Sequence, residues 1–306
     1  MRQSLLPSRR AGKGRKALLA RPSAVAERIE RAHSLDPVVH SLSDSVVRAL
    51  PAGPRTDALH GVPFGQPAHP TLVRLPLGCW TSAVLLDLFR GTERASAVLI
   101  AAGVAGTAPA AATGLADWSA LHQDQQRVGL VHAICQAGAA TLFLGSLGAR
   151  AGGRTSTGRA LSASGLALAS IGAYFGGHLA LRLGAGTSHA EQVSHLSGLG
   201  WHDLCGLDEL PDRRPVRRQL GYLSLLVYRQ GSEVSVLSDR CSHLGGPLHQ
   251  GRIVVERGAA CIACPWHGST FVIADGTVVH GPATARQPSF ETRVTAGGRI
   301  ELRPRP

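Results

Sequence analysis

The spacing of hydrophobic residues changes near residue 200, and the two parts of the chain predict different structures. Four long apolar segments come first, at 71–89, 95–115, 128–149 and 160–181. Each has about 19 to 22 residues, enough at about 1.5 Å per residue for a helix to cross a hydrocarbon core about 30 Å thick. The last three contain no Asp, Glu, Lys or Arg, whereas soluble helices of this length carry a charged outer face. The segments therefore predict a bundle of four transmembrane helices.

From Trp201 onward the hydrophobic residues alternate with polar ones in short runs. Examples are SLLVYRQ, EVSVLSD and RIELRPR, and Gly, Pro and Asp separate the runs. A period of two residues with frequent turn residues is typical of short strands. The expected fold class is a multi-domain membrane protein, with a four-transmembrane-helix bundle followed by an all-β domain of small antiparallel sheets.

These patterns divide the chain into segments with different expected roles. Residues 22–50 carry apolar residues at helical spacing. They predict one or two short amphipathic helices, broken at Pro37, that lie on the membrane surface or pack on the rest of the protein. The expected divisions are a disordered basic tail over 1–21, an amphipathic helical segment and connector over 22–65, the transmembrane domain over 66–184, a linker over 185–200 and the β domain over 201–304.

Much of the formal net charge of +12 lies at the N-terminus. Seven Lys or Arg and no acidic residue occur from Met1 to Arg21. Such a tail is typical of a solvated segment or of a contact with anionic lipid, where each basic residue contributes about 1 kcal/mol. A nucleic-acid partner is not expected, because no aromatic side chains are interleaved with the charges.

The expected membrane orientation depends on the same tail. The basic run leads only to KALLARP, which lacks the apolar stretch of a signal peptide. Four crossings place both termini on one side, and the Lys and Arg residues near the membrane are almost equally divided between the two sides. The cations of the tail favour termini in the cytoplasm, so we expect a multi-pass protein with a cytoplasmic β domain.

The candidate chemistry lies in the β domain. The stretch ACIACPWHGST, residues 260–270, holds Cys261 and Cys264 at a spacing that suits half of a zinc site or a redox dithiol. The segments CSHLGGPLHQG and CPWHGS each offer one thiolate and one imidazole, as Cys-x-His and Cys-x-x-His. Zinc fingers place a Cys pair before a His pair. The mixed order instead fits a [2Fe-2S] cluster, with two thiolates on one iron and two imidazoles on the other.

Residues 201–303 resemble a Rieske ferredoxin-like domain. The resemblance extends over both motifs, the opening GWHDLCGLDEL, the segment GTVVHGPA and the closing FETRVTAGGRIEL. It implies that Cys241 and Cys264 bind the buried iron, and that His243 and His267 bind the outer iron, which takes the electron. It also implies that the exposed histidine side is the docking point. Cys261 falls outside the pattern and is expected to be an ordinary strand residue.

The resemblance also bears on reduction potential. Respiratory-type Rieske proteins carry one extra cysteine in each loop, joined as a disulfide, and the equivalent positions here are Gly246 and Trp266. The domain therefore resembles the low-potential ferredoxin type, which can function in a reducing compartment. Trp266 and Pro282 are expected to form a lid over the cluster.

The apolar half resembles an uncharacterised family of four-helix bacterial membrane domains, which implies a bacterial cell membrane but no known activity. The matching pieces are LHGVPFGQPAHPTLVRLPLGCWTSAVLLDL, ATGLADW and RVGLVHA, and Gln66 stands where many relatives have a second histidine. An antiparallel bundle would bring four polar residues to the face that carries the β domain. These are His69, Asp117, His132 and His178.

Three roles for these four residues remain open. They can be structural hydrogen-bonding groups, bis-histidine ligands of haem b through His132 and His178, or a site for quinone or another redox partner.

The leading function hypothesis is a membrane-anchored electron carrier that works with a soluble reductase or oxygenase. The alternatives are a redox or iron sensor, and an oxidoreductase with haem or quinone in the membrane domain. An oxygenase needs a second domain with two His and one carboxylate on mononuclear iron, and only 39 residues follow His267. We therefore expect an electron-transfer protein or oxidoreductase component rather than a stand-alone enzyme.

Overall fold

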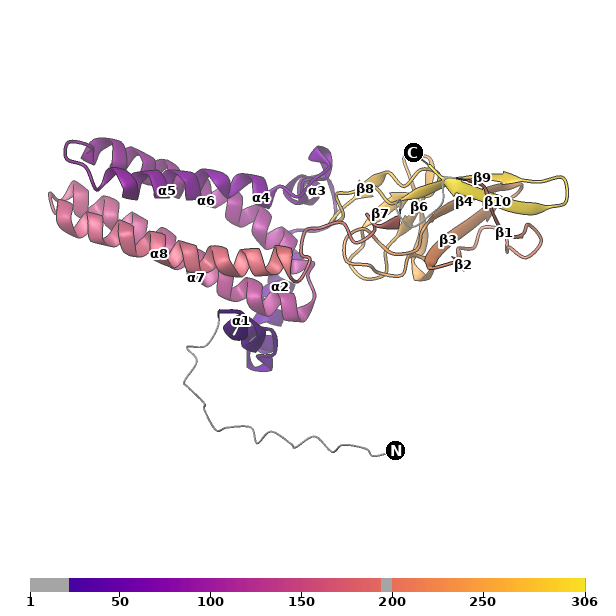
Figure 1. Cartoon of the computed structure of the whole chain (residues 1–306), viewed down its shortest axis with the longest axis horizontal. Helices are drawn as coiled ribbons and strands as arrows, with labels where there is room; N and C mark the ends of the chain where they lie inside the picture. The colour runs from indigo at the N-terminus through magenta and orange to yellow at the C-terminus, as the bar shows by residue number, and fades with distance from the viewer. Residues whose placement is uncertain (1–21, 194–199, 306) are drawn as a thin grey trace, which may run out of the picture.

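A computed structural model describes residues 22–193 and 200–305. It contains a helical bundle and a β domain that lies beyond one end of the bundle (Figure 1). The helices precede the strands along the chain, as the hydrophobic pattern predicts. The basic tail expected over 1–21 and part of the linker expected over 185–200 lie outside the described residues.

The helical part begins with short helices and continues with longer ones. The short elements are α1 Pro22–Glu30, α2 Asp36–Ala49, α3 Pro54–His60 and α4 His69–Leu72, with 3-10 turns at His33–Leu35 and Val62–Phe64. The longer helices are α5 Arg74–Leu86, α6 Glu93–Ser119, α7 Gln123–Ala151 and α8 Thr155–Leu181. Within the described ranges, α6, α7 and α8 are long and apolar enough to cross a membrane.

The first apolar segment differs from the single long helix that the sequence predicts. It forms α4 and α5, and α5 has 13 residues. Val73 joins them with helical backbone angles, φ −64° and ψ −18°, and its N–H donates to the His69 carbonyl at 3.1 Å. The two helices therefore follow one another without an extended break. Helix α5 packs along α6 and also contacts α8, which completes a four-helix bundle.

Aromatic rings packed on small residues form the core of the bundle. Trp80 of α5 stacks on Phe143 of α7, with ring centroids 4.3 Å apart. Gly103 of α6 lies so close to Trp80 that a Cβ would come within 2.5 Å of its ring. On the outer surface, Val98 and Ile134 keep more than half of their area exposed, at 63% and 61%. An apolar outer surface of this kind is typical of helices that face lipid.

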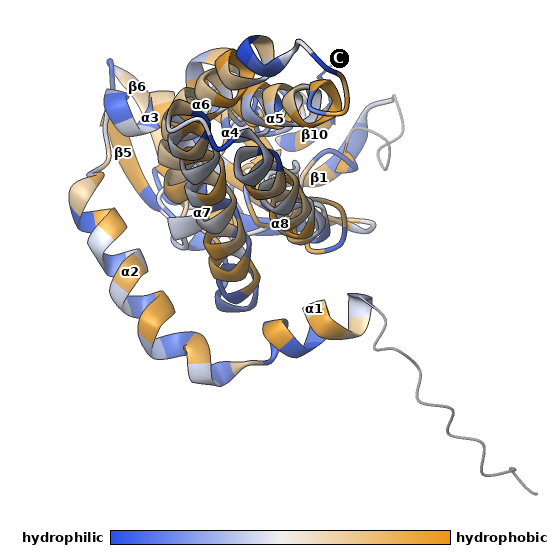
Figure 2. Cartoon of the chain, turned by 90° about the vertical axis from the view of Figure 1, so that its left-hand side faces the viewer, coloured by the Kyte–Doolittle hydropathy of each residue, from blue (hydrophilic) through white to orange (hydrophobic). Residues whose placement is uncertain are grey.

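The amphipathic helices α1 and α2 lie beside the bundle, and Figure 2 shows hydrophobic and hydrophilic residues along both. Ala26 and Val39 are fully buried against it. The break between them precedes Pro37, contrary to the sequence expectation. Pro37 instead lies in the first turn of α2, where a missing N–H costs no helical hydrogen bond. The apolar side chains of Val38 and Val47 remain exposed.

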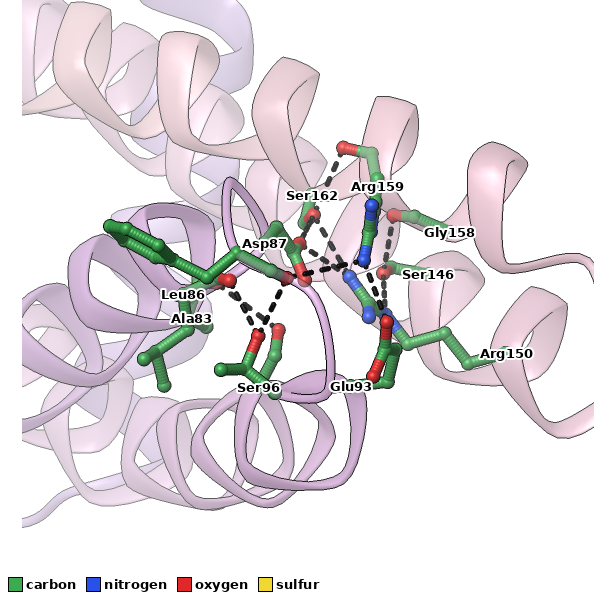
Figure 3. A network of polar contacts seen from close by, with 12 residues as sticks. Ala83, Leu86, Asp87, Glu93, Ser96, Ser146, Arg150, Gly158, Arg159 and Ser162 are labelled. Carbon is green, nitrogen blue, oxygen red and sulfur yellow. Dashed lines mark hydrogen bonds and ion pairs between the residues drawn. The ribbon is translucent and has the colours of Figure 1, made fainter.

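A polar network ties the helices together at the end of the bundle far from the β domain (Figure 3). Arg150 in the last turn of α7 donates to Asp87 at 2.5 Å, and both side chains are buried. Ser162 of α8 donates to the same carboxylate at 2.8 Å. The third apolar segment was expected to end at residue 149, but α7 continues to Ala151. The ion pair allows a charged residue to remain inside the helix end.

The β domain consists of two antiparallel sheets. The six-stranded sheet has the order β1-β10-β9-β4-β3-β2 and the four-stranded sheet the order β5-β6-β7-β8. The strands are β1 His202–Gly206, β2 Val216–Leu220, β3 Leu223–Gln230, β4 Glu233–Ser238, β5 Arg252–Glu256, β6 Ala259–Ala263, β7 Thr270–Val272, β8 Val278–His280, β9 Ser289–Val294 and β10 Arg299–Pro304.

Alternate residues of β3 serve two hydrophobic cores because successive side chains point to opposite faces of a strand. Leu225 and Val227 pack on one face of the six-stranded sheet. Leu226 packs between the two sheets with Leu248 of the 3-10 turn Leu248–Gln250 and with Phe271. This second core also contains Cys241 and Cys264, so the packing of the sheets positions both cysteines.

Candidate metal centre

Two short loops at one end of the four-stranded sheet carry the predicted ligands. One runs from Cys241 to Pro247 and the other from Cys264 to Ser269. Their backbones follow the same pattern: the Gly245 N–H donates to the Cys241 carbonyl at 2.8 Å, and the Gly268 N–H to the Cys264 carbonyl at 3.1 Å. Both glycines have positive φ, +75° and +77°, a conformation that is strained for other residues. Each loop therefore turns tightly just after its cysteine.

The two cysteine side chains are buried and hydrogen-bond to each other between the loops. Each sulfur also accepts hydrogen bonds from two backbone N–H groups of its own loop. The donors are His243 and Leu244 for the first sulfur, and Trp266 and His267 for the second. Because N–H groups stabilise a thiolate, the loops are suited to hold both sulfurs in the anionic form that metals require.

Each sulfur shifts the pKa of the other through the hydrogen bond between them. The hydrogen bond to Cys264, together with burial, raises the pKa of Cys241. The hydrogen bond from Cys241 lowers the pKa of Cys264 to about 7. The two sulfurs thus share one proton. A metal ion between them would displace that proton, because its charge stabilises both thiolates.

The two histidines form a second pair next to the cysteines. The His243 and His267 rings lie 5.1 Å apart between centroids, at 89° to each other. With a metal–nitrogen distance of about 2.0 Å, two rings on one tetrahedral ion have centroids about 5.2 Å apart. Burial lowers the pKa of His243 to about 3 and that of His267 to about 4. Both rings are therefore neutral near pH 7 and can donate a nitrogen lone pair to a metal.

This arrangement fits two metal ions better than one. Within residues 22–193 and 200–305, no group of three or more His, Cys, Asp or Glu could hold a single metal ion. A mononuclear zinc site needs its four ligands around one ion, whereas a [2Fe-2S] cluster with mixed ligands needs one pair for each iron. Two thiols and two imidazoles, presented in pairs by two similar loops, could hold such a cluster.

Gly246 and Trp266, the positions compared with the disulfide of respiratory-type proteins, are adjacent in space. A Cβ on Gly246 would lie 3.1 Å from the Trp266 ring and 2.8 Å from Cys264 Sγ. Trp266 therefore fills the space beside Gly246. Its side chain is 49% exposed, and its ring lies 5.3 Å from the ring of His122, between centroids. The indole thus contacts the helical part of the chain as well as its own loop.

Cys261 occupies a regular strand position. It lies in β6, pairs with Val254 of β5 and Val272 of β7, and is fully buried. Its Sγ approaches the Ala259 carbonyl at 3.6 Å, and burial raises the pKa of its thiol. The position is that of a small core residue rather than of a ligand in the cluster loops.

The histidine side of the site faces the end of the helical bundle, and His243 and His267 are partly exposed there. His122, which caps α7, lies 5.6 Å from the His267 ring between centroids. The His189 N–H donates to the Ser242 carbonyl at 2.8 Å. The segments that precede α7 and follow α8 therefore contact the loops that carry the ligands.

Asp57 of α3 makes the most specific contact between the two parts of the chain. Its carboxylate accepts hydrogen bonds from the Gly281 N–H and from His280 Nδ1, both at 2.9 Å. His60 packs on Gly281, where a Cβ would come within 3.1 Å of the His60 ring. Asp57 and His60 are buried. Sequence reasoning missed these residues because they lie in a Pro- and Gly-rich connector without a motif.

The four polar residues predicted for the bundle make three separate contacts. His69 and His132 face each other with ring centroids 6.3 Å apart. Asp117 accepts a hydrogen bond from His60 at 2.9 Å. His178 Nε2 lies 2.6 Å from a carboxylate oxygen of Glu30 in α1. The structure thus brings His69 together with His132 and directs Asp117 and His178 to other partners.

Comparisons with known proteins agree with this geometry. The Rieske [2Fe-2S] domain family matches residues 200–291. The anthranilate 1,2-dioxygenase ferredoxin subunit of Burkholderia cepacia is 32% identical over 97 residues, which are 32% of this chain and 86% of that protein. The chain therefore belongs to the Rieske [2Fe-2S] family through its β domain, and an electron-carrying protein with a [2Fe-2S] cluster is supported.

The helical part of the chain also matches a family, and the β domain matches further proteins. Residues 65–189 match the family described as predicted membrane protein (DUF2231). A human Rieske domain-containing protein is 34% identical over 74 residues, 24% of this chain and 46% of that protein. The ferredoxin of carbazole 1,9a-dioxygenase from Nocardioides aromaticivorans IC177 shares 25% identity, with a TM-score of 0.31, over 34% of this chain and 98% of that chain. The chain therefore joins a Rieske domain to a membrane domain of the DUF2231 family.

Proposed function

We propose that this protein is a membrane-anchored Rieske protein that carries single electrons between a soluble redox partner and an acceptor at the membrane domain. The ferredoxin subunits among its relatives are named for dioxygenases, which supports a soluble reductase or oxygenase as the partner. The apolar helices α6, α7 and α8 support anchoring in a membrane.

The four loop residues have separate roles in this proposal. When bound, the cluster accepts and releases one electron. Cys241 and Cys264 hold the buried iron, and the N–H groups aimed at their sulfurs stabilise the thiolate charge. His243 and His267 hold the outer iron as neutral imidazoles. The tight loop glycines fix the distances between these side chains.

One observation supports an electron acceptor at the membrane domain. His122, at the start of α7, lies against both His267 and Trp266, so the side of the site that exchanges electrons points at the bundle. A carrier that served only soluble partners would gain nothing from covering this side with its own helices. Asp57 adds two hydrogen bonds that hold the β domain in this position.

The test uses the full chain in proteoliposomes, with a ferredoxin reductase and NADH as the electron source and decylubiquinone as the acceptor. We expect many quinone molecules to be reduced per cluster. The matched control is Cys241→Ser, which should remove the activity together with the visible spectrum of the cluster. Slow reoxidation with one electron per cluster would contradict the carrier role and favour a redox sensor, in which cluster state alters the bundle.

We also propose that the β domain lies on the cytoplasmic side of a bacterial cell membrane. The basic residues of the N-terminal tail support this side. Fusions of green fluorescent protein and of alkaline phosphatase to the C-terminus test it directly. Fluorescence without phosphatase activity is expected. Phosphatase activity without fluorescence would place the domain on the opposite side.

A further inference from the structure

A pair of histidines inside the bundle is arranged for a ligand that the cluster site does not use. His69 begins α4 and His132 lies in α7, and neither is one of the four predicted cluster ligands. Their rings approach with centroids 6.3 Å apart and with planes at 86°. Both residues are only partly buried.

Hydrogen bonds fix the orientation and protonation of both rings. His69 Nδ1 lies 2.8 Å from the Ala110 carbonyl of α6, and His132 Nδ1 lies 2.7 Å from the Gly172 carbonyl of α8. Because a carbonyl only accepts, Nδ1 must carry the proton in each ring. Each Nε2 therefore has a free lone pair, and among the described residues neither has a hydrogen-bond partner. An imidazole held by its other nitrogen in this way is the usual arrangement for a metal ligand.

The separation of the rings selects a coordination geometry. A metal–nitrogen distance of about 2.0 Å, with about 1.2 Å from nitrogen to ring centre, places two rings on opposite sides of one ion with centroids about 6.4 Å apart. A tetrahedral angle would bring the centroids to about 5.2 Å. The cluster pair His243 and His267 shows 5.1 Å, whereas the bundle pair shows 6.3 Å. The bundle pair therefore fits trans coordination.

Glycines on the neighbouring helices make room for the rings. A Cβ on Gly114 of α6 would lie 2.8 Å from His69, and a Cβ on Gly176 of α8 would lie 3.1 Å from His132. A larger side chain at either position would displace its ring. The two glycines thus allow each imidazole to lie against a helix backbone.

We propose that His69 and His132 are the trans axial ligands of a haem iron. Within the described residues, no group of three His, Cys, Asp or Glu surrounds a common point, so the four equatorial ligands must come from the occupant. A porphyrin supplies four nitrogens and two negative charges. A bare divalent cation with two neutral ligands would instead leave its charge uncompensated among apolar helices, which is costly.

Two further features define the site. His178 is not the partner of His132, because its Nε2 is engaged by Glu30 at 2.6 Å. The sequence contains no C-x-x-C-H segment, so the haem is held without covalent attachment. The site stands independently of the proposed electron-transfer role, since no cluster ligand takes part in it.

The test uses the full chain, expressed with 5-aminolevulinic acid and purified in detergent. We expect a Soret band, a pyridine haemochromogen spectrum of haem b with about one haem per chain, and the anisotropic low-spin ferric EPR signal of perpendicular imidazole planes. His69→Ala and His132→Ala should each lower the haem content by at least about tenfold, since even outer-shell partners are worth that much in metal affinity.

Three controls keep the proposal open to contradiction. His178→Ala should retain the haem, and the EPR signal of the reduced cluster should persist in all three alanine variants. Free imidazole added to His69→Gly should restore the spectrum. The absence of a Soret band in the wild-type chain, or a metal found without porphyrin, would overturn the proposal. Loss of haem in His178→Ala but not in His69→Ala would overturn the assigned pair. Loss of quinone reduction with the haem retained would contradict only the proposed carrier role and would leave the haem site standing.

Discussion

The β domain and the helical bundle each present a pair of histidines, and the two pairs are built in different ways. His243 and His267 come from two short loops that also carry the cysteines. His69 and His132 come from helices far apart in the sequence, and backbone carbonyls of two other helices hold them. Local loop geometry determines the first pair, whereas the packing of α4, α6, α7 and α8 determines the second. A sequence motif can therefore reveal only the first.

The largest expected effect separates the cluster ligands from the neighbouring cysteine. Cys264→Ser should abolish the EPR signal of the reduced cluster, because the thiolate of Cys264 is one of the two expected on the buried iron. Cys261→Ser is the matched control and should keep the signal, since Cys261 lies in β6 away from both loops. Neither change should affect the bundle in circular dichroism. The reverse result, with the signal lost only in Cys261→Ser, would refute the ligand assignment.

The next effect concerns the bundle alone. Asp87→Ala leaves Arg150 buried without its carboxylate, and breaking a buried pair costs about 3–5 kcal/mol. Hydrogen exchange read by mass spectrometry should show faster exchange in α5, α7 and α8, with the β strands unchanged. Asp44→Ala is a suitable control, because Asp44 lies on the exposed side of α2. Equal exchange in the two variants would show that the network does not stabilise the bundle.

A smaller effect is expected where the two regions meet. Asp57→Ala removes two hydrogen bonds to a charged acceptor. A hydrogen bond of this kind contributes at most roughly 1.5–3 kcal/mol when it is buried. The β domain should then separate from the bundle more often, as measured by spin-label distances between α3 and β8, while the cluster spectrum stays unchanged. Asp57→Asn, which keeps one acceptor oxygen, should give an intermediate distance distribution. An unchanged distribution in both variants would mean that other contacts hold the domain.

The last expected effect is a pH dependence confined to the β domain of the cluster-free protein. The pKa values of His243 and His267 are about 3 and about 4 in the fold, against an ordinary value of 6.5. The unfolded chain therefore binds more protons below pH 6.5, so the free energy of unfolding falls as the pH decreases from 6.5 towards 4. Urea unfolding at several pH values measures this slope. His267→Gln should reduce the slope, and an equal slope would exclude His267 as its source.

Much of the fold follows from the sequence because its patterns are local. The long apolar runs fixed α6, α7 and α8 within a few residues, and the alternating runs predicted the antiparallel sheets. Helix boundaries were less predictable. Pro37 was expected to break a helix but lies in the first turn of one. The third apolar segment was expected to end at residue 149, but α7 continues to Ala151, with Arg150 paired to Asp87. Proline is best tolerated in the first turn of a helix, and the partner of Arg150 comes from the end of another helix. The local hydrophobic pattern reports neither fact.

The contacts at the meeting of the two regions could not be predicted for a similar reason. The acceptor role of Asp57 depends on Gly281, which is more than two hundred residues away in the sequence. His122 lies beside His267 only because the two domains meet. Neither residue belongs to a motif. The pairing of His69 with His132 likewise required the helix arrangement, whereas the sequence hypothesis for haem paired His132 with His178.

Under the proposed carrier role, the covalent connection between the bundle and the β domain has a kinetic consequence. A carrier joined to its acceptor by one short connection meets it at an effective concentration in the millimolar range, whatever the number of molecules in the cell. Electron exchange between the β domain and the bundle would then be first order, while exchange with a soluble partner would remain second order and would depend on that partner's abundance. The rate of supply from the soluble side would therefore set the flux, and the anchored step would not limit it.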